Sequence, residues 1–564
     1  MSVFKLPASL IREINSVISN YWWGDSGGKN RIHWKNWRFM GKERAVGGMG
    51  LRELEAFNKA LLAKQVWQLV QNPNSLIGRI LKAKYFPHSS ILEAAMGYRP
   101  SYTWRSLLSA RDLVCRGSRW RVGNGTSIRI WDDKWVPGLE GNKPSLGPQG
   151  KMGLDRVKDL IDHGSGEWRG DLLELLFSPV ECEAIRAIPI PRSAQADARC
   201  WDYTTDGKYT ICTGYKLAVE DPIEEPGVDD QEEEAPQAPV ACDWSALWKT
   251  QVPPKVRYFL WKVMHDILPT NVNLMKKLED KISADCPYCG IAETQLHRFM
   301  ECAWSRRIWR RSLWTDRYTH IEEETVQAWL NRVLTTADQE TIGGICCLLW
   351  FLWVERNNQV FNGPKLEEEE IARKAEAMFR EYKSEQEKLQ VKREGLNRRR
   401  VQWEPPSVGV LKVNTDAGWF GNEGTSLAMV VRDWTGEFVF AAARRETENW
   451  SPPIAEGRAI LFAMEQMNER EFGPYEIESD CLVIINRLEK QSEDLSELGT
   501  ICQMIWNSDG MRDCRAWRHT NREGNTVAHK IAHYSMHAFD CNSWLGSPPS
   551  FVLNELYSDL SHLA

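Results

Sequence analysis

The stretch LKVNTDAGW, residues 411–419, decides the fold of the last part of the chain. Apolar and polar residues alternate along it, which is typical of a β-strand that buries one face. The alternation runs into Asp416, and small residues follow. On its own, Asp416 fits an ordinary carboxylate at a strand end as well as it fits a metal ligand, so its meaning depends on the elements around it.

The sequence after this strand predicts a clear order of elements. Residues 426–445 predict two further strands joined by an Asp-Trp-Thr-Gly turn, and residues 452–470 predict a helix with proline near its start. A fourth strand is expected at 475–480, two helical stretches follow, and a fifth strand is expected at 514–520 before a last helix. The pattern predicts a mixed α/β domain over 406–541, with a five-stranded sheet that starts with three antiparallel strands.

Three acidic residues fall on three separate elements of this domain. Asp416 ends the first strand, Glu456 lies early in the first helix, and Asp480 ends the fourth strand. If the first and fourth strands are neighbours, the three carboxylates meet, which is unfavourable unless cations lie between them. Two Mg²⁺ ions are the usual partners of such a group in phosphodiester hydrolysis. Each acid also has an ordinary interpretation, as a strand end or as a favourable charge at a helix start.

The cysteines are scattered except for one group, in which Cys286, Cys289, His297 and Cys302 have the spacing Cys-x2-Cys-x7-His-x4-Cys. Zn²⁺ takes four sulfur or nitrogen ligands in a tetrahedron, and a closed set of four predicts a structural metal. The alternative, core cysteines beside a surface histidine, explains the close spacing less well. The zinc-binding helical module, expected over 244–315, either grips nucleic acid or only holds its own helices together.

Length and composition indicate several globular domains, because the 564 residues are 42% apolar and 26% charged. The net charge of −6 is uneven: residues 1–140 carry 22 basic and 10 acidic residues, whereas residues 405–564 carry 13 and 23. The basic front favours a polyanionic partner such as nucleic acid, although a solvated surface has the same composition. The 27 tryptophans either fill cores or stack on unpaired bases.

The other segments differ in composition. Hairpins are expected at 120–138 and around Asp206-Gly207. From Glu220 to Glu234 there are nine acidic and no basic residues, which predicts disorder. The expected segments are a basic, Trp-rich helical region at 1–140, a connecting segment at 141–218, an acidic linker at 219–243, helices ending in a charged and solvated spacer helix at 316–403, and a C-terminal tail at 542–564.

The sequence gives no sign of export or of a membrane partner. No secretory signal opens it, and the apolar run at 343–354 is too short to cross a membrane and predicts a buried helix. Reduced cysteines and an intracellular location, in the nucleus or the cytoplasm, are therefore expected.

Four short motifs carry a resemblance to a known family. They are KVNTDAGW (412–419), AEGRAI (455–460), IESDC (477–481) and WRHTNREGNTVAH (517–529). These motifs resemble the type 1 ribonuclease H fold, and more closely the ribonuclease H-like domain of plant non-LTR retrotransposons and related plant proteins. The cysteine group resembles the zinc-binding domain that follows reverse transcriptase in those elements. Residues 47–70 and 123–138 also resemble segments just after the polymerase.

The resemblance implies roles for particular residues. Asp416, Glu456 and Asp480 match three of the family's four metal-binding acids, which hold Mg²⁺ or Mn²⁺. The fourth acid stands in an N-x-x-A-D pattern that here reads NTVAH, so His529 occupies its place. A neutral imidazole ligates divalent ions, but it removes one negative charge from a site for Mg²⁺. His519 matches a histidine that assists proton transfer or product release in many ribonucleases H.

The resemblance implies a retroelement-derived endonuclease that binds RNA–DNA hybrid or RNA and cuts the RNA strand of the hybrid. The histidine at 529 and the acidic last domain favour an alternative, a nucleic-acid-binding relic without catalysis. An interaction scaffold is the third interpretation, which the Trp-rich front allows. The Tyr/Phe-x-Asp-Asp signature of a polymerase does not occur, and WDDKW at 131–135 lacks the apolar hairpin around it, so a complete reverse transcriptase is not expected.

Overall fold

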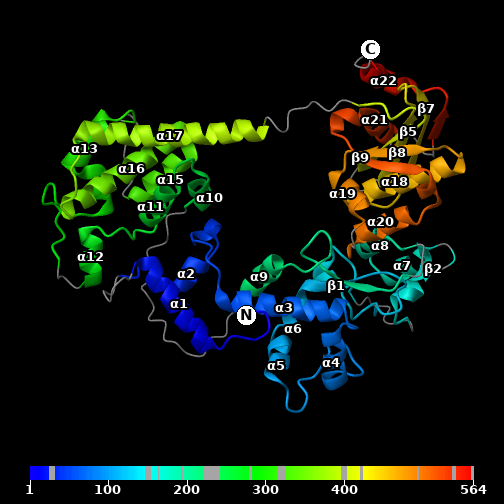
Figure 1. Cartoon of the computed structure of the whole chain (residues 1–564), viewed down its shortest axis with the longest axis horizontal. Coiled ribbons are helices and arrows are strands. Elements are labelled where there is room, and N and C mark those ends of the chain that lie inside the picture. The colour runs from blue at the N-terminus through cyan, green and yellow to red at the C-terminus, as the bar shows by residue number, and fades with distance from the viewer. Residues whose placement is uncertain are drawn as a thin grey trace. The chain divides into compact units, whose positions relative to one another are not determined.

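The computed structural model describes residues 1–24, 32–145, 154–162, 164, 166–191, 195–220, 242–278, 282–314, 325–394, 403–419, 424–491, 494–535 and 542–560. The chain forms two compact units (Figure 1). The sheet unit comprises 1–5, 56–221 and 399–564, and the zinc unit comprises 6–55 and 222–398. The acidic linker falls almost entirely on 221–241, outside the described residues. Within the described ranges, no helix combines the length and the hydropathy that a bilayer span requires.

One six-stranded mixed sheet forms the centre of the sheet unit. Its strands are β5 (Leu411–Trp419), β6 (Thr425–Arg432), β7 (Phe438–Glu446), β8 (Tyr475–Ser479), β9 (Cys514–His519) and β10 (Asn542–Leu545). They lie in the order β10-β7-β6-β5-β8-β9, with antiparallel pairing from β10 to β5 and parallel pairing from β5 to β9. The five strands expected from the sequence are all present. The sixth, β10, comes from the segment expected to be a tail and pairs with β7.

Period-two alternation along β6 explains how the sheet is covered on both faces. Leu427, Met429 and Val431 belong to one hydrophobic core, whereas Ala428 and Val430 belong to another. All eight residues of β6 are therefore buried. The covering helices are α18 (Pro452–Glu469), α19 (Leu482–Lys490) and α20 (Glu497–Trp506) in the first core, and α21 (Thr526–Ser535) and α22 (Leu553–Leu560) in the second.

The front part of the sheet unit is largely helical, as predicted. Its elements are α3 (Leu54–Gln71), α4 (Leu76–Tyr85), α5 (Tyr102–Ser109), α6 (Arg111–Gly117), β1 (Ser118–Arg121), β2 (Ile161–Asp162), β3 (Glu167–Trp168), α7 (Gly170–Leu176), α8 (Pro179–Arg186), β4 (Ala198–Trp201) and α9 (Ile211–Val219). Trp67, Trp104 and Trp201 lie in its hydrophobic core, so these tryptophans pack rather than stack on bases.

The predicted hairpin at 120–138 is wrong. β1 pairs with β4, with Ser118 opposite Trp201. Among the described residues, a single backbone hydrogen bond, from the N–H of Trp120 to the carbonyl of Lys134 at 2.7 Å, joins it to the residues that follow. The carboxylate of Asp197 accepts hydrogen bonds from the backbone N–H groups of Gly123, Gly125 and Ser127. The Gly-Asn-Gly segment therefore wraps around a side chain instead of closing a strand pair.

The turn around Asp206-Gly207 leads into a helix, α9, as predicted, but the predicted hairpin is wrong. One backbone hydrogen bond, from the N–H of Trp201 to the carbonyl of Gly207 at 2.7 Å, spans the turn, and no second strand pairs with β4 there among the described residues. The turn packs instead against a distant residue. The carbonyl oxygen of Asp206 accepts a hydrogen bond from the backbone N–H of Leu495 at 3.0 Å. Gly207 has a φ of +67°, and a Cβ atom there would lie 2.8 Å from the backbone of Leu495. A positive φ and this close approach both require glycine.

The zinc unit is mainly helical. Its helices are α1 (Ala8–Trp23), α2 (Trp37–Gly41), α10 (Trp244–Lys249), α11 (Pro254–Met264), α12 (Asn271–Leu278), a π-helix at His297–Glu301, α13 (Ala303–Arg311), α15 (Val326–Thr336), α16 (Gln339–Val360) and α17 (Glu368–Glu394). The apolar run at 343–354 lies inside α16 and is largely buried, as predicted. The prediction of a solvated spacer helix is wrong for the first half of α17, which lies along α16 (Figure 1). Ile371, Ala375 and Phe379 of α17 are buried in the core that contains α16.

Candidate active site and zinc cluster

Three carboxylates meet at one edge of the large sheet. β5 and β8 are parallel neighbours with Thr415 opposite Ser479, so the next residues, Asp416 and Asp480, lie side by side. Asp480 follows the end of β8, but Asp416 does not end its strand as predicted, because β5 continues to Trp419 in its pairing with β6. Glu456 reaches both aspartates from α18, and one oxygen of each carboxylate lies within 4.8 Å of the other two. The sheet register therefore brings together acids that are far apart in the sequence.

The carboxylate group is short of positive charge. Asp416 is 4% exposed, and burial raises its pKa. Burial also raises the pKa of Glu456 well above its ordinary value, and the charges of Asp416 and Asp480 add to this effect. A divalent cation would relieve the repulsion between the carboxylates, which adds to the effect of burial on these pKa values. A group with only carboxylate oxygens fits Mg²⁺ or Mn²⁺, which prefer hard ligands.

His529 contacts the carboxylate group without joining it. Its Nδ1 lies 2.9 Å from Oδ2 of Asp416, and this hydrogen bond raises the pKa of His529. Its Nε2 lies 3.4 Å from a guanidinium nitrogen of Arg522. Among the described residues, the group whose ligand atoms meet contains only the three acids. The place expected for a fourth acid is thus taken by a hydrogen-bond partner of Asp416.

Asn525 fixes the start of α21 against β5. Its side-chain amide donates to the carbonyl of Thr415 at 2.9 Å, and its own carbonyl accepts from the backbone N–H of His529 at 3.1 Å. Asn525 is 1% exposed, so these bonds are shielded from water. It therefore positions His529 over Asp416. This role was not predicted, although the asparagine that opens the N-x-x-A pattern is its signal in the sequence.

A buried polar network lies beside Asp416 on β5. Nζ of Lys412 lies 3.2 Å from Oε1 of Glu478, and the side-chain amide of Asn414 donates to Oε2 of Glu478 at 2.8 Å. Nε1 of Trp403 donates to Oδ1 of Asn414 at 3.0 Å. Lys412, Asn414 and Asp416 alternate along β5, which predicts one solvent-facing side, yet all three are buried. The network was not predicted because its covering residues come from other parts of the chain.

His519 ends β9, opposite Ser479 in the parallel pair of β8 and β9. Its side chain is exposed. Within the described part of the chain, no hydrogen bond or ion pair joins it to the three acids, and it is not in their group. His519 therefore lies at the end of the strand beside β8, outside the carboxylate group.

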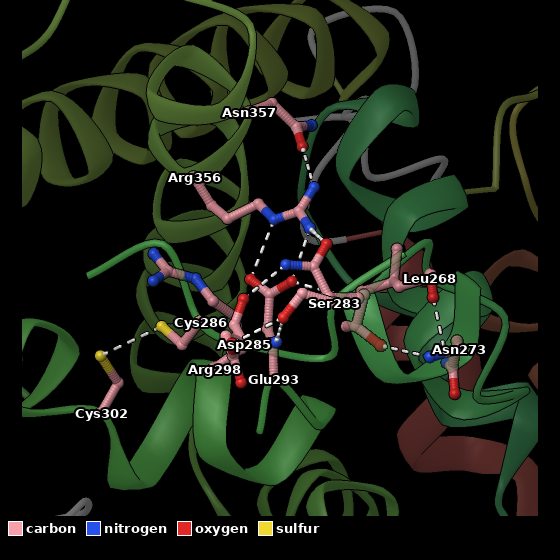
Figure 2. Close-up of polar contacts among 12 residues, drawn as sticks. Leu268, Asn273, Ser283, Asp285, Cys286, Glu293, Arg298, Cys302, Arg356 and Asn357 are labelled. Atoms are coloured by element: carbon pink, nitrogen blue, oxygen red, sulfur yellow. Dashed lines mark hydrogen bonds and ion pairs between the residues drawn. The ribbon is translucent and has the colours of Figure 1, made fainter. Parts of the chain in front are cut away.

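The four predicted zinc ligands also meet. The Sγ atoms of Cys286 and Cys302 are 3.9 Å apart (Figure 2). The Sγ atoms of Cys289 and Cys302 are also 3.9 Å apart, and Nε2 of His297 lies 3.1 Å from Sγ of Cys289. In a tetrahedron with Zn–S bonds of about 2.3 Å, two sulfurs are about 3.8 Å apart. The spacing and the distances both fit a closed, structural zinc site.

Two local structures position these ligands. A turn holds the first pair, because the backbone of Cys286 accepts from Gly290 at 3.0 Å and donates to Ile291 at 2.7 Å. The π-helix holds the second pair, because its i to i+5 bond joins the carbonyl of His297 to the N–H of Cys302 at 2.8 Å. Ligands five residues apart therefore lie on one side of the helix.

A buried cation lies beside the zinc ligands. Arg298 is 0% exposed, and its guanidinium lies 4.6 Å from the ring centre of Trp304 and 4.9 Å from that of Tyr288. It donates to the carbonyl of Leu352, and two of its nitrogens have no hydrogen-bond partner among the described residues. A hydrogen bond with Cys286 lowers the pKa of Cys302, and backbone N–H groups and Arg298 act in the same direction. A lowered pKa favours the thiolate, the form that binds zinc.

A buried ion pair braces the loop that carries Cys286. Arg356 of α16 donates to both oxygens of Glu293, at 2.9 and 2.5 Å (Figure 2). The same carboxylate accepts from the backbone N–H of Asn271 at 2.8 Å, which ties the loop to the start of α12. Both charged residues are almost fully buried, and their paired geometry offsets the cost of that burial.

The mixed sheet, with acids at the ends of its central parallel strands, defines an α/β domain of the ribonuclease H-like class. The model of the family described as reverse transcriptase-like matches residues 414–535, and the model described as zinc-binding in reverse transcriptase matches residues 232–309. Among solved structures, RNase H1 of the archaeon Halobacterium salinarum is 17% identical, with a TM-score of 0.21 over 23% of this chain and 98% of that chain. LC11-RNase H1 in complex with an RNA/DNA hybrid is 15% identical, with a TM-score of 0.20 over 22% of this chain and 96% of that chain.

Two proteins of Arabidopsis thaliana are similar in sequence. One, named "Putative ribonuclease H protein", is 27% identical over 578 residues, which cover 96% of this chain and 88% of that protein. The other, named "Uncharacterized mitochondrial protein", is 39% identical over 137 residues, which cover 24% of this chain and 89% of that protein. This chain belongs to the family of retroelement-derived plant proteins that join a reverse-transcriptase zinc-binding domain to a ribonuclease H-like domain.

Proposed function

We propose that this chain is a divalent-metal-dependent endonuclease that cuts the RNA strand of RNA–DNA hybrids. The observation that carries the proposal is the meeting of Asp416 of β5, Glu456 of α18 and Asp480, which follows β8. A strand end or a helix start uses one acid and gains nothing from three. Burial, and after it the charge of the neighbouring carboxylates, raises the pKa of two of these acids, Asp416 and Glu456. The ribonuclease H-like domain and the name of a relative support the substrate class.

The three carboxylates would hold Mg²⁺ or Mn²⁺, which when bound activates water and stabilises the leaving 3′ oxygen. Oδ2 of Asp416 forms a hydrogen bond with Nδ1 of His529, and this bond fixes the rotation of the carboxylate. Asn525 in turn fixes the helix from which His529 reaches it. His519 presents an exposed imidazole at the end of β9, where it can carry a proton between the cut strand and solvent.

Selectivity for the hybrid would come from the sugar–phosphate backbone, since the 2′-OH distinguishes an RNA strand from a DNA strand. Residues 405–564 carry 13 basic and 23 acidic residues, so the ribonuclease H-like domain by itself repels a polyanion. Divalent cations and the basic residues of 1–140 would compensate for this charge. Cleavage by the full chain is therefore expected to be stronger than cleavage by the last domain alone.

The test is cleavage of a labelled RNA–DNA hybrid by the full chain with Mg²⁺ or Mn²⁺. Asp416→Asn keeps the size of the side chain and removes its charge, and it should lower the rate by more than the factor of about 100 that the loss of an outer-shell partner causes. Asp509→Asn, an exposed acid of the same domain, is the matched control and should leave the rate unchanged. The proposal would be contradicted if the chain failed to cleave the hybrid with Mg²⁺ and with Mn²⁺, or if the Asp416 variant cleaved it as fast as the native chain.

A nucleic-acid-binding protein without catalysis is the second candidate. The observation that favours it is the contact of His529 with Asp416, because the imidazole uses one oxygen of that acid and adds no negative charge. This candidate predicts salt-dependent binding of the hybrid and no cleavage with either metal. Loss of both binding and cleavage would leave an interaction scaffold as the remaining interpretation.

A further inference from the structure

A ladder of aromatic rings runs through the zinc unit. In order, its rings are Trp22, Tyr258, Trp261, His265 and Phe39, and neighbouring ring centres are 4.8–5.8 Å apart. Trp261 is fully buried, whereas Trp22, Tyr258 and Phe39 are partly exposed. The ladder therefore has a buried centre and ends that reach the surface of this unit.

Cations lie over the outer rings of this region. Lys262 lies 4.5 Å from the ring centre of Tyr258, and Lys35 and Lys42 lie 5.2 and 5.4 Å from that of Phe39. Arg44 lies 5.0 Å from a ring centre of the neighbouring Trp248, and its Nε donates to a backbone carbonyl. Within the described ranges, none of the four cations has a carboxylate oxygen within the 4.0 Å of an ion pair.

Core packing explains the rings but not the cations. Lysine and arginine stems cover apolar surface readily, yet their charged ends usually reach water or an acid. Here four positive charges gather around one aromatic cluster, and within the described ranges no carboxylate forms an ion pair with any of them. Lys35 acts on Asp266 only through the weaker attraction between their charges, and burial raises the pKa of that carboxyl. Burial also lowers the pKa of Lys262. Such a surface attracts a polyanion.

We propose that this cation–aromatic surface binds single-stranded nucleic acid. It comprises Lys35, Phe39, Lys42, Arg44, Tyr258 and Lys262. Phosphates bind the ammonium groups and draw them away from the rings, and unpaired bases stack on the ring faces that the ammonium groups leave, as in other single-strand binding surfaces. The site belongs to the zinc unit and uses none of the three acids, so it goes beyond the proposed cleavage and does not depend on it.

The rings favour a single strand over the other polyanions. In a duplex the bases stack on one another and offer no free face to a protein ring, so a duplex would use only the cations. An acidic peptide offers carboxylates but no series of planar groups. RNA and DNA single strands share the chemistry that this surface recognises, and the experiment distinguishes them.

The test measures binding of fluorescent 15-nucleotide oligo(U) and oligo(dT) to the full chain by anisotropy over a series of salt concentrations. The chain carries Asp416→Asn so that cleavage does not interfere. The slope of log K against log salt should fall by about 0.7 for each phosphate contact removed from a single strand. The double variant Lys42→Gln with Lys262→Gln should therefore reduce the slope by about 1.4 and weaken binding.

The matched control is Lys276→Gln with Lys277→Gln, which removes the same charge from exposed positions on α12 of the same unit. It should leave the slope unchanged. Zinc content and circular dichroism are measured for both variants, and an unchanged value in each shows that the zinc unit is folded. Tighter binding of oligo(U) or of oligo(dT) identifies RNA or DNA as the ligand, and either result supports the site.

Three results would overturn the proposal. One is an equal loss of binding in the two double variants, and another is no loss in either. The third is equal affinity for the oligonucleotide, for an abasic oligomer of the same length and for a duplex, which would mean that the rings do not contact bases. Hybrid cleavage by the chain with the native Asp416 is measured separately, so failure of this site and failure of the proposed nuclease are distinguishable.

Discussion

The zinc cluster and the carboxylate site differ in the positive charge that lies beside their ligands. The zinc ligands come from residues 286–302 and lie beside the buried cation of Arg298. The acids come from three elements between 416 and 480, and the imidazole of His529 lies 2.9 Å from Asp416. The comparison teaches that a closed ligand set can be complete within one module, whereas the carboxylate site is complete only when cations reach it.

The largest expected effect is loss of the zinc cluster. Cys302→Ser replaces a buried thiol with a hydroxyl, which is a poor zinc ligand, and bound zinc should fall from about one ion per chain to almost none. Because structural zinc contributes about 10 kcal/mol or more to the folding of small zinc modules, the melting temperature of the zinc unit should fall markedly.

Metal analysis and thermal unfolding measure both effects of Cys302→Ser. Cys346→Ala is the control, since Cys346 is buried in the core that surrounds the cluster but is not a ligand. It should keep its zinc and lose only packing. If Cys302→Ser kept full zinc occupancy, the cluster would not be a closed set of four ligands, and the contrast with the carboxylate site would fail.

The next effect concerns the cation beside the cluster. Three thiolates, one imidazole and one Zn²⁺ carry a net negative charge, which Arg298 can balance. Arg298→Met keeps the bulk without the charge and should weaken zinc binding by about 10- to 100-fold, as loss of an outer-shell partner does. Competition with a chromophoric chelator measures the affinity. Arg298→Lys should recover part of it, and equal affinity in all three proteins would show that Arg298 only packs.

The meeting of the four candidate zinc ligands could be predicted from the sequence because its geometry is local. A Cys-x2-Cys turn and a following helix place four ligands together whatever the rest of the chain does. The π-helix at His297–Glu301 was not predicted, because an i to i+5 bond leaves no pattern in the residues. Arg298 was not predicted either, since its burial depends on Trp304 and on the distant carbonyl of Leu352.

The carboxylate site could be predicted only in part. Strand order and the acid at each element were readable, but the burial of Lys412 and Asn414 was not, because Trp403 and Glu478 cover them from outside β5. The two predicted hairpins failed for the same reason. Asp197 and Leu495, each far from the turn it contacts, decide the local backbone.

A smaller effect should appear in the stability of the sheet unit in buffer without Mg²⁺ or Mn²⁺. The folded pKa of Glu456 lies well above its unfolded value, so the folded state holds this proton more tightly. Stability is therefore present below the unfolded pKa and is lost as pH rises toward the folded pKa, by about 1.4 kcal/mol per pKa unit. Urea unfolding between pH 4 and 8 measures the loss.

Two changes should remove this pH dependence. Glu456→Gln carries no titrating group at that position, and added Mg²⁺ or Mn²⁺ offsets the repulsion between the ionised acids. Glu465→Gln, on the same helix, is the control and should keep the native pH dependence. A stability that rises with pH in the unaltered chain would contradict the assignment of a crowded carboxylate group. The zinc unit should show no such response to Mg²⁺.

The smallest expected effect comes from restoring a fourth acid. His529→Asp removes the hydrogen bond to Asp416 and adds a negative charge beside it, so the site should bind Mg²⁺ more tightly and cleave at lower Mg²⁺ concentration. A Mg²⁺ titration of hybrid cleavage measures the half-saturating concentration, which should fall by a factor of about 10 if the new charge contributes about 1.4 kcal/mol. His533→Asp, one turn further along α21, is the control for a charge added to the same helix. If His529→Asp cleaves the hybrid less well at every Mg²⁺ concentration, the imidazole of His529 itself positions Asp416. The carboxylate site would then depend on a hydrogen bond to one of its acids, whereas the zinc cluster depends on a fourth metal ligand.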